Sequence, residues 1–116
     1  MNSKQKGKAG ELALAAYFRE HGFASAARGV QYKGGPESQD VVGIPGIHSE
    51  CKYMASLQLH PALEQAAKDA GSGDVPVVFY KQVSAATRKP GAAKPWVAIL
   101  SAEDFLLMWR ELQVFR

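Results

Sequence analysis

Residues 40–53 read DVVGIPGIHSECKY, and this stretch decides the fold. Short apolar segments flank the Pro-Gly pair at positions 45 and 46, a combination typical of a turn between two strands. The pattern predicts a β-hairpin with one strand over residues 40–44 and the other over residues 47–53. A β-sheet is therefore expected at the centre of the molecule.

Three charged side chains in this hairpin are candidates for chemistry. Side chains two apart in a strand share a face, so Glu50 and Lys52 project together while Cys51 points the other way. Asp40 stands in the neighbouring strand. Paired carboxylates supply the hard oxygen ligands that Mg²⁺ prefers, and an ammonium can orient a water or steady the charge of a phosphate. The alternative interpretation is ordinary solvent-facing charge on a sheet surface.

The length of the hairpin loop decides whether Asp40 and Glu50 meet. Residues directly opposite in an antiparallel pair share a face. A two-residue turn would pair Asp40 with Cys51 and turn the aspartate to the wrong face. A site that uses both carboxylates therefore predicts a loop of three or five residues centred on Pro45, or a bulge, with Gly46 at positive φ.

The rest of the chain alternates helical and strand-like patterns. Apolar periodicity and end signals predict three helices: one at residues 3–21 before a stop at Gly22, one from His60-Pro61 to Gly71 with the proline at its first position, and one from a Ser101 cap to about residue 114. The remaining patterns predict strands at residues 25–32, 75–81 and 95–100, and loops at residues 33–36 and 82–95. The resulting order, α-β-β-β-α-β-β-α, predicts one α/β domain over residues 1–116, with helices packed against a mixed sheet.

Length, cysteine content and hydropathy limit the class of protein. A chain of 116 residues suffices for one hydrophobic core. A single cysteine excludes an intrachain disulfide and a multi-cysteine zinc site, and it favours a reducing, cytoplasmic setting. The apolar runs at residues 12–18 and 105–109 are shorter than the roughly 20 residues of a membrane helix, so we expect a soluble protein with no membrane span. A secretory signal is the competing interpretation of the N-terminus, but Arg19 and Glu20 interrupt the segment before Ala24-Ser25-Ala26, which resembles a cleavage site.

Charge is distributed unevenly along the chain. The net charge is +4 for residues 1–35, −4 for residues 36–75 and +3 for residues 76–116. Two basic flanks around an acidic middle suit a protein that binds a polyanion through its flanks and a cation through its acidic middle. Chance clustering in a small protein is the alternative explanation.

Taken together, these segments resemble the PD-(D/E)xK nucleases, and within that superfamily they are most similar to the archaeal-type Holliday junction resolvases. The resemblance spans about residues 4–100 and is carried by four segments: Lys6-Gly7-Lys8-Ala9-Gly10-Glu11, Asp40-Val41-Val42-Gly43-Ile44, Glu50-Cys51-Lys52, and Glu64-Gln65 followed by residues 75–81. One departure is Gln39, which stands where a proline often precedes the aspartate.

This resemblance implies a restriction-endonuclease-like fold and a Mg²⁺-dependent endodeoxyribonuclease in which Mn²⁺ substitutes for Mg²⁺. Asp40 and Glu50 would be metal ligands, and Glu11 would be a helix-borne acid that supports the metal. Lys52 would be the catalytic lysine and Gln65 an accessory polar residue. A four-way DNA junction presents two strands across a two-fold axis, so the resemblance also implies a homodimer.

Partners follow from the charged flanks and from the C-terminus. The candidate DNA-binding side chains are basic and lie in both flanks: Lys4, Lys6, Lys8, Arg28, Lys33, Arg88, Lys89 and Lys94. The last helix carries more apolar residues than one core-facing stripe needs, which indicates a subunit contact; packing of this helix into the core of its own chain is the alternative. Two other functions stay open: a nuclease of the same superfamily acting on other DNA, of the repair, restriction or phage type, and a non-catalytic basic DNA-binding subunit.

Overall fold

The computed structural model describes residues 3–29, 39–83 and 94–114 and has an α/β architecture. Its three helices are α1 (Ser3–Glu20), α2 (Leu59–Asp69) and α3 (Ala102–Val114). Its five strands are β1 (Ala27–Arg28), β2 (Val41–Val42), β3 (Ile47–Met54), β4 (Val75–Gln82) and β5 (Val97–Ile99). The order of elements is the one that the sequence pattern predicts.

Three strands are shorter in the described part of the chain than the patterns at residues 25–32, 40–44 and 95–100 predict. They are β1 (Ala27–Arg28), β2 (Val41–Val42) and β5 (Val97–Ile99). Residues 30–32, the loop expected at residues 33–36 and residues 84–93 of the loop expected at residues 82–95 lie outside the described residues.

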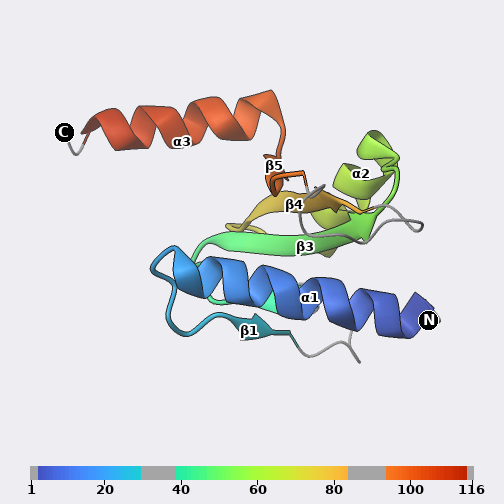
Figure 1. Ribbon diagram of the computed structural model, residues 1–116. Coiled ribbons are helices and arrows are strands. Elements are labelled where there is room, and N and C mark those ends of the chain that lie inside the picture. The colour runs from blue at the N-terminus through green and yellow to red at the C-terminus, as the bar shows by residue number, and fades with distance from the viewer. Residues whose placement is uncertain (1–2, 30–38, 84–93, 115–116) are drawn as a thin grey trace.

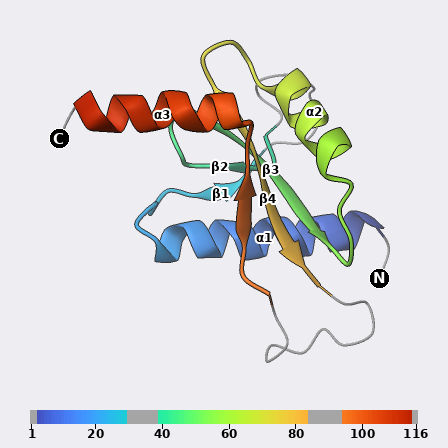
Figure 2. The ribbon, with the colours of Figure 1, turned by 90° about the horizontal axis from the view of Figure 1, so that it is seen from above.

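The five strands form one mixed sheet in which spatial order follows chain order (Figures 1 and 2). β1, β2 and β3 are antiparallel neighbours, and β4 and β5 pair in the same way. β3 and β4 run parallel over eight residues each. Parallel neighbours require a crossover connection, which α2 supplies. This connection places α2 beside the strand that carries the candidate site.

Helices cover both faces of the sheet (Figure 1). α1 lies on one face, where Leu14 and Phe18 pack with Val41 in a buried cluster. α2 lies on the other face, where Ala62 and Ala66 pack against Val78 of β4, with further apolar side chains around them. The core of the described chain is therefore split between the two faces of one sheet.

The ends of the helices match the local signals in most respects. Gly22, at φ +97°, ends α1 as predicted: its N–H donates to Arg19 O, and the next N–H, that of Phe23, donates to Phe18 O. Ser101 caps α3, because its Oγ accepts a 3.0 Å hydrogen bond from the N–H of Asp104.

The start of α2 differs from the prediction that proline occupies its first position. The helix begins at Leu59, so Pro61 is its third residue. Proline is tolerated there because the first N–H groups of a helix have no partner within the helix.

α3 follows β5 and stands apart from the sheet (Figures 1 and 2). Among the described elements it makes at most marginal contact with any other helix or strand. Its large apolar side chains are accordingly exposed. No helix in the described ranges has the length and apolar character to cross a membrane.

Candidate active site

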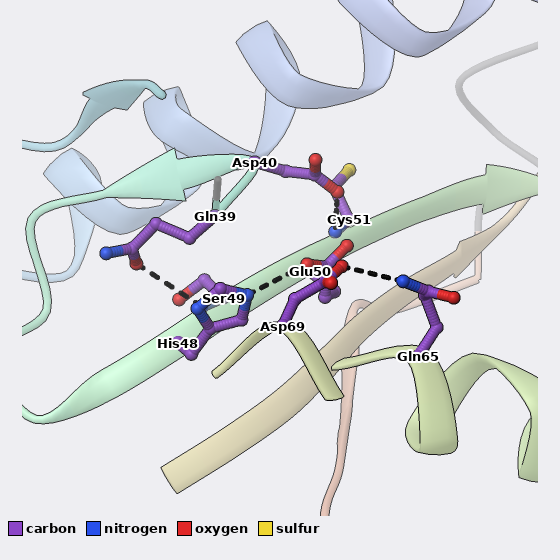
Figure 3. A network of polar contacts seen from close by, with 8 residues as sticks. All are labelled: Gln39, Asp40, His48, Ser49, Glu50, Cys51, Gln65 and Asp69. Atoms are coloured by element: carbon purple, nitrogen blue, oxygen red, sulfur yellow. Dashed lines mark hydrogen bonds and ion pairs between the residues drawn. The ribbon is translucent and has the colours of Figure 1, made fainter. Parts of the chain in front are cut away.

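The hairpin brings Asp40 beside Glu50. Val41 pairs with Ser49, and Asp40 lies just before β2, where its N–H donates to Ser49 O at 2.9 Å. Regular antiparallel pairing joins directly opposite residues, so Asp40 reaches the site from the end of β2 and not as a paired strand residue. Its side chain lies beside that of Glu50 (Figure 3). The structure therefore brings together the two carboxylates on which the predicted site depends.

The connection between β2 and β3 combines a tight turn with one extra residue. The N–H of Ile47 donates to Ile44 O at 3.1 Å, which closes a β-turn with Pro45 and Gly46 at its centre, and Gly46 adopts φ +83°. Val41 pairs with Ser49, so Val41 lies three residues before Ile44 whereas Ser49 lies only two residues after Ile47. The extra residue shifts the register by one, which is the bulge that the sequence analysis gave as the alternative to an odd-numbered loop.

Each of the two carboxylates is held by one group of β3 (Figure 3). The backbone N–H of Cys51 donates to Oδ2 of Asp40 at 2.8 Å. Nε2 of His48 lies 2.9 Å from Oε1 of Glu50. Both contacts come from the strand that carries Glu50, so the pair is anchored by the most central part of the sheet.

The carboxyls of Asp40 and Glu50 interact strongly. Burial raises the pKa of Glu50 to about 8, and the charge of Asp40 and a hydrogen bond with its side chain add to the rise. Asp69 contributes in the same direction, whereas Lys52 opposes it. Two acids in this position favour one shared proton at neutral pH, and a cation between them would take its place.

The donor set fits a hard divalent cation. Asp40 and Glu50 offer carboxylate oxygens from adjoining strands, which is the chemistry that Mg²⁺ and Mn²⁺ prefer, with water completing the coordination. In the described ranges, no three His, Cys, Asp or Glu side chains converge closely enough to hold a metal ion by themselves. The pair therefore suits a cation that keeps several waters.

Glu11 lies outside this pair. Its Oε1 accepts a 2.8 Å hydrogen bond from Nε of Arg28, which forms an ion pair across α1 and β1. Burial raises the pKa of Glu11, and the charge of Asp40 adds to the rise while Arg28 opposes it. Glu11 is thus within electrostatic reach of Asp40, but Arg28, a predicted DNA-binding residue, occupies its carboxylate.

Gln65 points from α2 toward the site together with a residue that the sequence analysis missed (Figure 3). Its Nε2 donates to Oδ2 of Asp69 at 2.8 Å, and the charge of Asp69 helps to raise the pKa of Glu50. Asp69 is three residues after the buried Ala66, so it falls on the same inner stripe of α2. An acid on an alanine-rich inner stripe is a sequence signal that could have identified it.

The structure also describes the side chains of Cys51 and of three of the candidate DNA-binding residues. Cys51 is partly buried, and burial raises the pKa of its thiol, which keeps it protonated and unsuited to nucleophilic attack. Lys8 and Lys94 are exposed. The side chains of the other candidate DNA-binding residues apart from Arg28 lie outside the described part of the chain: Lys4, Lys6, Lys33, Arg88 and Lys89.

Comparisons with known proteins add no relative: no family model matches the chain, and no curated protein or solved structure matches it either.

Proposed function

We propose that the protein is a Mg²⁺-dependent endodeoxyribonuclease of the PD-(D/E)xK type, with a restriction-endonuclease-like fold, that acts on branched DNA such as a four-way junction. The observation that carries the proposal is the position of the Asp40 side chain, which accepts a hydrogen bond from the N–H of Cys51 and lies beside Glu50 (Figure 3). Lys52 follows Glu50 by two residues in β3, and its charge opposes the rise in the pKa of Glu50.

Each side chain then has a defined task. Asp40 and Glu50 would hold the cation, anchored by the N–H of Cys51 and by His48. When bound, Mg²⁺ would supply positive charge for a phosphate oxygen and lower the pKa of a coordinated water. The ammonium of Lys52 would steady the negative charge that develops on the phosphate.

The proposed partners are DNA and a second copy of the chain. The basic flanks would contact phosphates, which position a duplex without reading its sequence. The exposed apolar helix α3 would join two protomers, so that two identical sites face the two strands of a junction. A single cysteine suits the reducing cytoplasm for this activity.

The test is cleavage of a synthetic four-way junction, and of its component duplexes, by the full chain with Mg²⁺. We expect Asp40→Ala to keep DNA binding and to lose at least about 100-fold in cutting rate, because the cation supplies several kcal/mol of transition-state stabilisation. Glu64→Gln is the matched control, since it removes a carboxylate from the exposed surface of α2 and should cut at the wild-type rate.

Each other outcome has a separate meaning. Cutting by Asp40→Ala at the wild-type rate would overturn the proposed site. Equal cutting of linear duplex and junction would favour a superfamily nuclease of the repair, restriction or phage type. Binding by the wild-type chain without any cutting would favour the non-catalytic DNA-binding subunit.

A further inference from the structure

His48 is a fully buried imidazole next to the acid pair. Its relative exposure is 0%, and its Nε2 lies 2.9 Å from Oε1 of Glu50 (Figure 3). The two residues are two positions apart in β3 and so project from the same face of the strand. Nothing in the hydrolysis described above requires His48 to touch a phosphate or a metal.

The contact between His48 and Glu50 determines which ring nitrogen would carry a proton. A metal-bound carboxylate has only acceptor oxygens, so the donor in the metal-bound protein would be Nε2–H of His48.

The other ring nitrogen shows that packing alone does not explain His48. Nδ1 is buried and has no hydrogen-bond partner among the described residues. A buried acceptor without a partner costs stability, and an apolar side chain of similar size would avoid that cost. The contact that distinguishes His48 from such a side chain is the one made by Nε2.

We propose that His48 is a positioning residue, which donates Nε2–H to Oε1 of Glu50 and thereby leaves the second carboxylate oxygen free for a divalent cation beside Asp40. Asp40 is held in the same manner by the N–H of Cys51. Each ligand thus has one oxygen tied to β3. Hydrogen bonds to ligating side chains fix their orientation before the metal arrives, and losing one typically weakens metal binding 10- to 100-fold. This inference rests on the proposed function.

The experiment compares two amides at position 48. The side-chain nitrogen of glutamine is as many bonds from Cβ as Nε2 of histidine, whereas that of asparagine matches Nδ1. His48→Gln can therefore restore the donor to Glu50, and His48→Asn cannot. Mn²⁺ affinity is measured on the full chain from the electron paramagnetic resonance signal of free Mn²⁺, and circular dichroism confirms that each variant is folded at the temperature used.

We expect His48→Asn to bind Mn²⁺ about 10- to 100-fold more weakly than wild type, and His48→Gln to stay within about threefold of wild type. Equal affinity of His48→Asn and wild type would overturn the positioning role and leave the proposed nuclease intact. An equal loss of Mn²⁺ affinity in the two folded variants would also overturn the positioning role, because a side-chain N–H at the position of Nε2 would then have no effect on metal binding. A wild-type chain that takes up no Mn²⁺ would overturn both proposals.

Discussion

Glu50 is an acid whose ionisation opposes folding in the absence of metal. Its ordinary pKa is 4.5, and in the folded chain burial and the charge of Asp40 raise the pKa to about 8. The folded protein therefore binds a proton that the unfolded chain releases. Stability from this group is fully present below pH 4.5 and is lost as the pH rises to about 8.

This difference predicts the pH dependence of stability after metal removal. In EDTA the free energy of unfolding should fall between pH 5 and pH 8, by up to about 1.4 kcal/mol per pH unit from this group. Glu50→Gln cannot ionise and should flatten that fall. Mg²⁺ should also reduce it, because the cation binds the ionised pair. Urea denaturation across this range measures the effect, and parallel pH profiles for wild type and Glu50→Gln in EDTA would contradict it.

At the scale of single elements, α1 carries one glycine in open space, Gly7, and one in close contact with β3, Gly10. A Cβ at Gly7 would meet no atom within 4 Å, whereas a Cβ at Gly10 would lie 2.5 Å from Cβ of Tyr53 in β3. Glycine inside a helix is less favourable than alanine because its backbone loses more freedom on folding. Position 10 requires glycine because α1 approaches β3 closely there, whereas position 7 has room for a side chain.

The two positions form a matched pair of substitutions in one helix. Gly7→Ala should raise the free energy of unfolding by about 0.5–1 kcal/mol. Gly10→Ala should lower it by about 1–3 kcal/mol, because the added methyl group overpacks the contact between α1 and β3. Chemical denaturation of both variants measures these two changes in the free energy of unfolding. A stabilising Gly10→Ala would mean that α1 does not approach β3 as closely as described.

At the scale of the whole molecule, α3 is the element that makes at most marginal contact with the other described helices and strands. Leu106 is 56% exposed and Leu112 is 60% exposed, and the large apolar side chains between them are exposed as well. Successive residues of a helix point in different directions, so this helix is apolar over more than one face. An isolated helix of 13 residues is marginal in water, and contact with a second protomer would stabilise it.

Sedimentation velocity tests this proposed dimer. We expect the wild-type chain at tens of micromolar to sediment with twice its mass of 12.5 kDa. The double variant Leu106→Gln with Leu112→Gln should sediment as a monomer, because it removes two large apolar contacts from the interface. Glu111→Gln, a polar change on the same exposed helix, should leave the dimer intact. A wild-type monomer at this concentration would contradict the role given to α3.

Local patterns in the sequence determined much of the architecture and the centre of the site. Turn chemistry predicted the turn at Pro45-Gly46 with Gly46 at positive φ, and strand alternation put Glu50 and Lys52 on one face. Gly22 and Ser101 marked helix ends correctly. These features depend on residues that are close in sequence, where the geometry of a strand, turn or cap leaves few alternatives.

The tertiary structure alone decided the surroundings of the acid pair. In the folded chain His48 is buried in contact with Glu50, the charge of Asp69 acts on the same carboxyl, and Glu11 forms an ion pair with Arg28. Each of these depends on the rotation of a helix about its axis or on how closely two layers pack. Such quantities are set by contacts between segments that are distant in sequence, so no short stretch of residues contains them.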